Sequence, residues 1–371
     1  MKTPRDWVTR PLSQFVSLQR GFDLPTHARV PGSVPVLSSG GVNGSHNEAK
    51  VDGDNFVIGR VTNIGRPTWS SVPFWPLNTT LFVKDFLGNF PKFCFYWFLA
   101  TDLSGFDSGS VQPVLNRNYI ANIPVAIPSF VEQRRIAGVL GALDDKIESN
   151  QNLAEVIPSL IDAQIHHELS DGSGDSIPVN KLAKFVNGGA YTKEASGTGR
   201  MVIRIADLNT GPGASTIYND IDVPGDRLAH FGDLLMSWSG SLGVYVWVRE
   251  EAIVNQHIFK VILTDFPAWL VHNRLNVALH GFRAIAADKA TTMGHIQRKH
   301  LDETFVEVPI AKLEQLNHLC IPLWNRFISA QLESMRLAKL RDALLPELMS
   351  GRMRVDEAGC LVSEALDEEV R

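Results

Sequence analysis

Two stretches of the chain carry apolar residues that fall on one face of an α-helix, at intervals of three and four in the first stretch and of seven in the second. Polar Asn150 stands at one core position of the first series. The apolar positions are Ile136, Leu140, Leu143, Ile147, Ala154, Ile157 and Ile161 in the first stretch and Leu316, Leu323, Ala330, Leu337 and Leu344 in the second. This spacing is typical of a coiled coil, so we predict two long helices that pair. The alternative, in which each helix packs separately onto its own domain, stays open.

The two predicted helices begin and end with the same short motifs. A Glu-Gln pair opens each of them, at Glu132 and at Glu314, and each closes on Glu-Leu followed shortly by Ser and Gly. The preceding blocks also match, since Asp54–Arg60 corresponds to Asp233–Ser239 in its apolar rhythm. The repeat period is about 180 residues, far longer than the roughly 20–50 residues of a solenoid unit. The chain is therefore a tandem duplication of a globular block followed by a long helix.

This repeat predicts the order of domains along the chain. Short β-type runs such as Val34–Leu37 alternate with glycine turns in the first block, and the apolar run Phe90–Asp102 predicts a helix buried against the strands. The fold class that follows is α+β, with two mixed α/β domains joined by long helices that pack as an antiparallel coiled coil with pseudo-twofold symmetry. The expected segments are a first domain at 1–128, a helix at 129–170, a second domain at 171–308, a second helix at 309–350 and a tail at 351–371.

Composition narrows the class of protein without naming its partner. Apolar residues make up 44% of the chain and charged residues 20%, which is ordinary for a globular protein. No apolar run approaches the roughly 18–20 residues of a membrane span, and Met1–Asp6 leads into no signal-peptide core. We therefore expect a soluble, cytoplasmic protein without membrane contact. The net charge of −5 counts modestly against nucleic acid, although Arg60, Arg66 and the run Arg298–His300 fall in turn-like segments.

Motifs for catalysis are missing from the sequence. No Pro-Pro dipeptide occurs, which excludes the Asn/Asp-Pro-Pro-aromatic loop that cradles the flipped base in adenine methyltransferases. Neither the phosphate-binding pattern GxxxxGK followed by Ser or Thr nor the zinc pattern HExxH occurs. Cys94, Cys320 and Cys360 are too far apart to indicate a zinc site or a disulfide framework. We predict a binding protein with no catalytic or metal-ligating residues.

Two Pro-rich segments lead into the helices, Ile123–Ile136 and Val308–Gln315. The first helix continues as Leu140–Asn150, and the second closes as Leu340–Gly351. In this duplicated order the segments resemble those of the type I restriction–modification specificity subunits, and the resemblance covers essentially the whole chain. The second helix departs from the family pattern at Leu316–Pro322, where the usual basic-Ile continuation is absent and a proline is present.

The resemblance implies a role in DNA recognition. It implies two target recognition domains, each reading one half of a bipartite double-stranded DNA sequence, and helices that fix the unread spacer and seat partner subunits. Two modification subunits would bind S-adenosylmethionine and methylate adenine, so this chain would hold no cofactor itself. Restriction subunits would join in hosts that contain them. Two other classes of protein stay open: a fused enzyme with an unfamiliar catalytic motif, and a scaffold whose blocks bind protein.

The residues that contact DNA are predicted from chemistry alone. Arg, Lys, Asn and Gln are the side chains that favour base edges, while Ser, Thr, Lys and backbone amides mostly hold phosphates. The candidates in the first block are Asn43, His46, Arg60, Asn63, Arg66, Gln112, Asn116 and Arg117, and those in the second are Tyr191, Lys193, Arg204, Ser237, Ser239, Gln297, Arg298 and Lys299.

Overall fold

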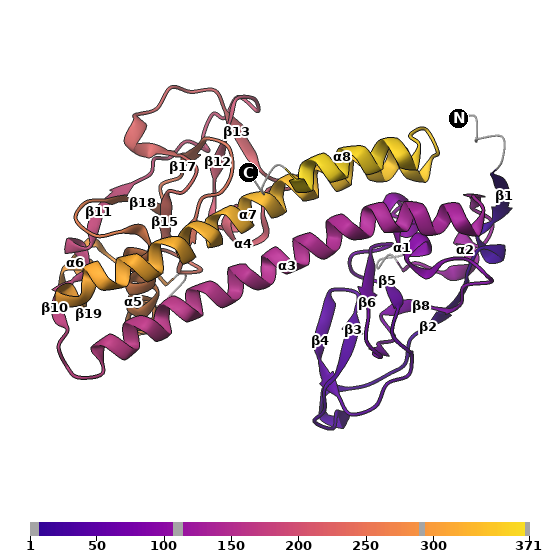
Figure 1. The fold of residues 1–371 in the computed structure, drawn as a ribbon, viewed down its shortest axis with the longest axis horizontal. Coiled ribbons are helices and arrows are strands. Elements are labelled where there is room, and N and C mark those ends of the chain that lie inside the picture. Colours follow the sequence, from indigo (N-terminus) through magenta and orange to yellow (C-terminus); the bar gives the residue numbers. More distant parts are fainter. Residues whose placement is uncertain (1–6, 107–113, 289–293, 368–371) are drawn as a thin grey trace. The chain divides into compact units, whose positions relative to one another are not determined.

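The computed structural model describes residues 7–106, 114–288 and 294–367 (Figure 1). It divides the chain into two compact units. Unit 1 consists of Met1–Ile147 together with Arg336–Arg371, and unit 2 is Glu148–Met335. The divisions fall inside the two long helices, α3 (Phe130–Leu169) and α7 (Leu313–Met349). Each unit therefore contains a segment of both.

Unit 1 contains a four-stranded sheet of order β2-β8-β5-β6, a three-stranded sheet of order β4-β3-β7 and the pair β1-β9. The aromatic helix α1 follows β8 in the chain. The elements ahead of α3 are β1 (Val8–Pro11), η1 (Leu12–Gln14), β2 (Ser17–Arg20), η2 (Thr26–Ala28), β3 (Val34–Ser38), β4 (Gly41–His46), β5 (Asn55–Gly59), β6 (Pro67–Ser70), β7 (Trp75–Pro76), β8 (Thr80–Asp85), α1 (Pro91–Ala100), α2 (Arg117–Ile120) and β9 (Pro124–Ile127).

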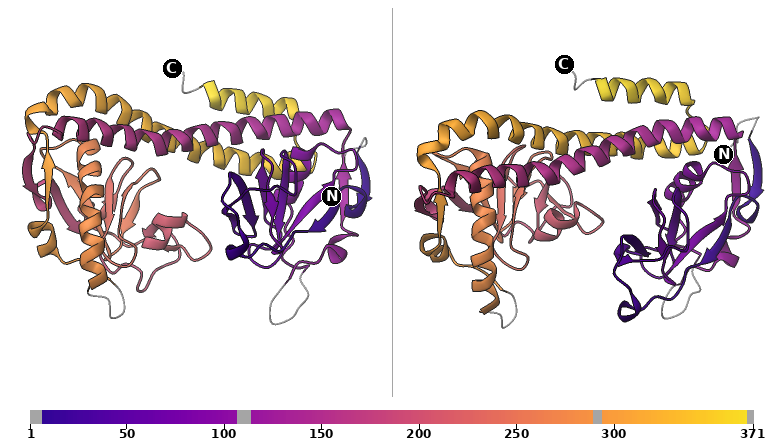
Figure 2. Two further views of the ribbon diagram at one scale, coloured as in Figure 1. Left: turned by 90° about the horizontal axis from the view of Figure 1, so that it is seen from below. Right: turned by 60° about the horizontal axis from the view of Figure 1, so that its bottom comes forward.

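Unit 2 has the corresponding sheets, of order β11-β18-β15-β16 and β13-β12-β17-β14, and the pair β10-β19. Figure 2 shows its strands on one side of its segments of α3 and α7. The elements are β10 (Asp175–Pro178), η3 (Val179–Lys181), β11 (Ala183–Asn187), β12 (Arg200–Ile203), α4 (Ile205–Thr210), β13 (Ile217–Asn219), η4 (Gly225–Arg227), β14 (Leu228–Ala229), β15 (Leu234–Ser237), β16 (Gly243–Val246), β17 (Ala252–Val254), β18 (Ile258–Leu263), α5 (Ala268–Asp288), α6 (Arg298–Glu303), β19 (Phe305–Val308) and η5 (Ile310–Lys312).

The two units repeat one topology. In each, the first and last strands of the block pair antiparallel just ahead of a long helix, as β1 with β9 and β10 with β19. The second sheet of each unit has a strand with one antiparallel and one parallel neighbour. In unit 1, β3 pairs antiparallel with β4 and parallel with β7. In unit 2, β12 pairs antiparallel with β13 and parallel with β17. The tandem duplication predicted from the sequence is therefore also a duplication of strand order.

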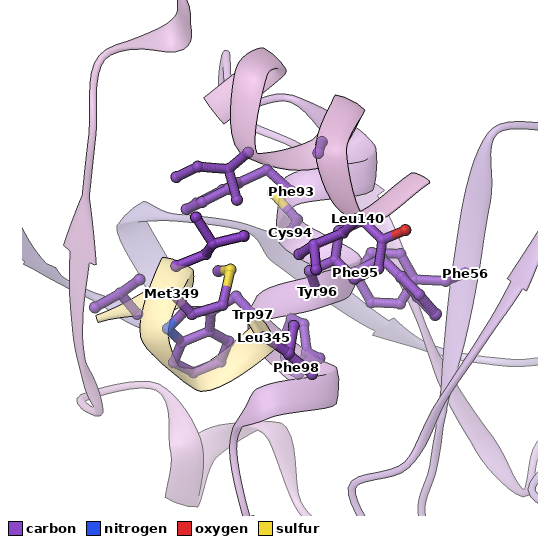
Figure 3. Packing of buried hydrophobic residues seen from close by; sticks show 14 of the residues in the cluster. Phe56, Phe93, Cys94, Phe95, Tyr96, Trp97, Phe98, Leu140, Leu345 and Met349 are labelled. Carbon is purple, nitrogen blue, oxygen red and sulfur yellow. The ribbon is translucent and has the colours of Figure 1, made fainter. Parts of the chain in front are cut away.

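The aromatic helix α1 forms the centre of the unit 1 core, as Figure 3 shows. Pro91 occupies its first turn, where a proline costs no helical hydrogen bond. Its six consecutive residues Phe93–Phe98 are all buried, because the strands cover one side and the long helices the other. Leu140 of α3 and Leu345 of α7 belong to the same cluster. The buried helix predicted from the apolar run at Phe90–Asp102 is found.

A polar contact inside unit 1 joins α1 to both long helices. The Tyr96 hydroxyl donates to Asp144 Oδ2 at 2.6 Å, and Arg341 Nη1 donates to Asp144 Oδ1 at 2.9 Å. Burial, followed by the negative charge of Asp144, raises the pKa of the Tyr96 phenol well above its ordinary value. The phenol therefore keeps its proton and remains a donor to the carboxylate.

Two elements differ from the sequence prediction. Residues 298–300 were expected in a turn-like segment but begin the helix α6, because Gln297 has the extended backbone of an N-cap and its N–H donates to His300 Nδ1 at 3.0 Å. The tail, to which we assigned no structure, contains α8 (Val355–Asp367). Val355, Ala358 and Val362 of α8 are buried in the unit 1 core.

The long helices pair antiparallel in unit 2. Asn150 of α3 lies against Glu333 of α7, and Glu168, near the end of α3, accepts from Lys312 just ahead of α7 at 3.2 Å. Asn150 is 0% exposed and its Nδ2 donates to Glu333 Oε2 at 2.8 Å. A polar side chain at a core position fixes the register of paired helices. The prediction of paired helices is confirmed over the alternative of separate packing. Within the described ranges, none of the helices is both long and apolar enough to cross a membrane.

We predict that the two buried polar groups at this contact are coupled. In Asn150→Leu, the Glu333 carboxylate loses a donor while it stays buried, so the free energy of unfolding should fall by about 1–3 kcal/mol. Replacing both residues by leucine removes the polar groups together and should recover most of that loss. Urea unfolding of the wild type, both single variants and the double variant measures the coupling. A double variant that loses the full sum of the two single effects would show that the groups act independently.

Candidate nucleic-acid interface

The structure brings three of the unit 1 candidates together at one hollow. Arg60, Asn116 and Arg117 line a space of about 780 Å³ that we call hollow 1, between β2, the end of β8 and the first turn of α2. Arg20 and Lys84, which the sequence analysis did not single out, line it too. The charged and amide side chains of hollow 1 are Gln19, Arg20, Arg60, Lys84, Asn116, Arg117 and Asn118.

Backbone carbonyls hold the arginines of hollow 1 in place. Arg60 donates from Nη1 to Asn78 O at 2.9 Å and from Nε to Leu115 O at 3.3 Å. Arg20 Nε donates to the same Asn78 carbonyl at 3.3 Å. Burial, and then the positive charge of Arg20, lowers the pKa of the Arg60 guanidinium. The positive charge of Arg20 therefore acts against the charged form of Arg60 at this hollow.

Arg117 and Asn116 are set by the start of α2. Asn116 is the N-cap residue, and its side chain accepts from the Asn118 N–H at 3.0 Å. Arg117 is exposed and donates from Nη1 to Leu18 O of β2 at 3.0 Å. These bonds fix the backbone and one side of the guanidinium, so the wall of hollow 1 is preorganised.

The β4 candidates and their neighbours lie elsewhere in unit 1. Exposed Asn43 accepts hydrogen bonds from Arg29, through its carbonyl and, at 3.2 Å, through Oδ1. His46 is buried, with Nδ1 accepting from the Val30 N–H at 3.1 Å and its ring against Trp75. These contacts give His46 a structural role. The amide of exposed Asn63 donates to Ser39 O at 3.2 Å.

Arg66 is exposed at the turn ahead of β6. It neighbours Asp102, whose pKa is lowered mainly by hydrogen bonds from Ser104 and slightly by the charge of Arg66. Gln112 falls outside the described residues.

In unit 2, Tyr191 and Lys193 lie in the segment after β11. The Tyr191 hydroxyl accepts from Arg227 Nη1 at 2.9 Å, which anchors the segment to η4. Lys193 is exposed. Lys193 is therefore free to meet a ligand, whereas the Tyr191 hydroxyl already has a protein partner.

Arg204 forms an ion pair with buried Asp207 in α4. Its Nε donates to Asp207 Oδ2 at 2.9 Å and its Nη2 to Oδ1 at 3.2 Å. Burial acts to raise the pKa of Asp207, but hydrogen bonds from Arg204 and Thr216 together outweigh it, and the pKa is lowered. Two nitrogens of the Arg204 guanidinium that could contact a base edge, Nε and Nη2, donate to Asp207 instead, so the pair first serves the fold.

The serine candidates of unit 2 are buried. The Ser237 hydroxyl donates to Ser241 O at 2.6 Å and accepts from the Gly243 N–H at 2.8 Å, which ties the β15–β16 hairpin. Ser239 forms an isolated bridge with His295. The sequence pattern did not reveal this burial, because it cannot tell that β15 is an interior strand of its sheet.

The remaining candidates gather at the start of α6. Gln297, Arg298 and Lys299 are exposed, and Arg298 lines a second space of about 730 Å³ that we call hollow 2, between η3, β11, η4 and α6. Arg298 Nη2 donates to Phe185 O of β11 at 2.7 Å. The charged side chains of hollow 2 are Lys181, Lys184, Asp226, Arg227, Asp265, Arg298 and Asp302.

Hollow 1 and hollow 2 occupy equivalent places in the two units. An arginine at the first position of a short helix donates to a carbonyl of the first sheet strand in each, Arg117 to Leu18 and Arg298 to Phe185. The segment ahead of that helix also donates one backbone hydrogen bond in each unit. In unit 1 the Leu115 N–H donates to the carbonyl of Arg60, just after β5, and in unit 2 the Ile296 N–H donates to the carbonyl of Trp238, just after β15. Candidates predicted separately in the two blocks thus fall at one repeated structural position.

No group of three or more His, Cys, Asp or Glu side chains in the described ranges is close enough to hold a metal ion.

Comparisons with known proteins agree with this architecture. A family model for the type I restriction modification DNA specificity domain matches residues 4–159. The chain is 24% identical over 327 residues to the type I restriction enzyme MjaIX specificity subunit of Methanocaldococcus jannaschii, covering 76% of this chain and 74% of that protein. It is also similar to the crystal structure of a type I restriction–modification S subunit from M. genitalium, with 15% identity, a TM-score of 0.60 and coverage of 94% of this chain and 98% of that one. The α+β fold class is confirmed.

Arg204 yields a test of whether this candidate serves stability. A carboxyl whose folded pKa is depressed contributes stability above its unfolded pKa and loses it as the pH falls through the folded pKa. Arg204→Ala removes the hydrogen bonds that counteract the effect of burial on the pKa of Asp207. The pKa of Asp207 should therefore rise, and this carboxylate should bind its proton at a higher pH. We expect a loss of about 1–3 kcal/mol near neutral pH and an onset of acid unfolding at higher pH. Denaturant unfolding across acidic pH measures both. Thr216→Val, which removes one smaller bond to Asp207, should give a smaller shift in the same direction, and an unshifted onset in Arg204→Ala would contradict the assignment.

Proposed function

We propose, from the premise that the chain belongs to the type I restriction–modification specificity subunits, that it recognises a bipartite DNA sequence, with one half-site read by each block. The observation that carries this proposal is a backbone contact that occurs in both units. It joins the residue after β5 to the segment that leads into α2, and the residue after β15 to the segment that leads into α6. One backbone arrangement presents Arg60, Asn116 and Arg117 in unit 1 but Trp238, Gln297 and Arg298 in unit 2. Equal frames with unequal side chains suit two half-sites of different sequence.

The chain would act as an adaptor and not as a methyltransferase. It has no Pro-Pro dipeptide to form the catalytic loop expected for adenine methylation. In this proposal two modification subunits dock on the long helices, bind S-adenosylmethionine and carry out the methylation, and restriction subunits join in hosts that contain them. The specificity chain supplies the choice of sequence.

The candidates are not equivalent within this proposal. Exposed residues such as Lys193 and Lys299 are available to DNA as they stand. Asn43 and Gln297 are exposed too, but their side-chain oxygens already accept hydrogen bonds inside their units. Ser237, His46 and Arg204 already have partners inside their units. We therefore assign base and phosphate contacts first to the exposed group.

Exchange of one block tests the assignment of one block to one half-site. We expect that replacing residues 1–128 by the corresponding block of another specificity subunit changes one half of the methylated motif and leaves the other half intact. The junction lies ahead of Phe130, and strands β1 and β9 move together because they pair with each other. Mapping of adenine methylation in cells that also make the modification subunit measures the motif.

The controls for this exchange separate the rival functions. The purified chain without the modification subunit should transfer no methyl group, and transfer by the chain alone would establish an enzyme. An unchanged motif after the exchange, with the hybrid folded, would contradict recognition by this block. A change in both halves would contradict the separation into half-sites.

The long helices should set the unread spacer. Insertion of four residues between Ile147 and Glu148, matched by four between Met335 and Arg336, leaves every contact inside each unit in place. Each insertion adds about 6 Å of helix, which corresponds to one or two base pairs at roughly 3.4 Å each. We expect both half-sites to stay the same and the spacer between them to lengthen, as measured by methylation mapping. Four residues inserted after Gly172, outside the helix, serve as the matched control. An active helix variant that methylates at the original spacing would contradict the proposal.

A further inference from the structure

Hollow 1 is a cluster of cations. Arg20, Arg60, Lys84 and Arg117 line it, and no Asp or Glu is among its described lining residues. None of these four side chains forms an ion pair with another residue in the described part of the chain. The local positive charge stands out in a chain whose net charge is −5.

Hollow 2 has the same frame and a different charge. It is also lined by four cations, Lys181, Lys184, Arg227 and Arg298, but Asp226, Asp265 and Asp302 line it with them. The duplication therefore supplies an internal comparison. The helix arginine donates to the strand carbonyl in both units. The same backbone frame is therefore compatible with acidic side chains at the hollow and with none.

Like charges held close together are unfavourable unless an anion joins them. The charge of Arg20 acts against the charged form of Arg60, and carbonyl bonds keep both guanidinium groups at the hollow. Each of these bonds uses only part of the five N–H donors of an arginine. The remaining donors and the Lys84 ammonium suit an anion with several oxygen acceptors, and a phosphodiester is such an anion.

We propose that hollow 1 binds a phosphate group of the DNA backbone and that hollow 2 does not. This inference rests on the proposed function, because it takes duplex DNA as the source of the phosphate. Arg20 and Lys84 join the candidates Arg60 and Arg117 as phosphate-binding residues. Because such a contact carries no sequence information, unit 1 contributes more than unit 2 to the electrostatic part of binding, whatever bases each unit reads.

Charge removal at the two hollows tests the inference. Lys84→Gln and Arg20→Gln are made in the full chain with its modification subunit, and affinity for a random-sequence duplex is measured over a range of salt concentrations. Loss of one phosphate contact should reduce the slope of log affinity against log salt by about 1. Target and random duplexes should weaken by the same factor. Lys84→Arg, which keeps the charge, should retain the wild-type slope.

Lys184→Gln at hollow 2 is the matched control for Arg20→Gln, since it removes one positive charge from β11, which corresponds to β2. Its slope should equal that of the wild type. Folded unit 1 variants with an unchanged slope would overturn the inference, and so would an equal reduction in Lys184→Gln. Failure of the proposed function looks different: the wild-type complex would then show no preference for target over random duplex, while the slopes of the variants on random duplex would still report on hollow 1.

Discussion

Burial of an apolar surface made from both long helices is the constraint on which each unit depends. Leu140 of α3 and Leu344 of α7 are buried in one cluster with α1, and Ile161 of α3 and Phe327 of α7 are buried in another with α5. A fully buried side chain of this size contributes about 1.5–3 kcal/mol, against a total stability of roughly 5–15 kcal/mol for a domain. Neither repeat can therefore complete its core from its own residues, although each contains one full block and one full helix.

The sequence was most informative where a periodic pattern and burial coincide. The 3,4 spacing around Leu140 predicted α3, and the apolar run at Phe93–Phe98 predicted α1, because in both cases the buried face determines the residue types. It failed where tertiary contacts decide. The helix at Arg298 depends on a cap made with His300. For α8 the pattern was present in the sequence, since Val355, Ala358 and Val362 recur at helical spacing and are buried in the unit 1 core, although we assigned the tail no structure.

The candidate interface shows the same division. Chemistry alone selected Arg60, Arg117 and Arg298 as candidates, and the structure places the first two at hollow 1 and the third at hollow 2. Reasoning from residue type did not select Arg20 or Lys84. These residues come from β2 and β8, and they line the same hollow only because the two strands pair. Residue type also did not distinguish Ser237 from exposed serines, although the Ser237 hydroxyl donates to the Ser241 carbonyl within the β15–β16 hairpin. Residue type limits what a side chain can bind, while pairing of the strands decides which side chains share a surface.

The discontinuity of unit 1 has a consequence for the order of events during translation. Unit 2 is one uninterrupted stretch, Glu148–Met335, whereas unit 1 needs Arg336 and the residues after it. The first block to leave the ribosome is thus the last to acquire its complete core. At roughly 5–20 residues per second, the wait is on the order of tens of seconds, during which the apolar face of α1 lacks the cover of Leu345 and Met349. Simple N-to-C folding of two tandem domains would instead complete the first block before the second is made.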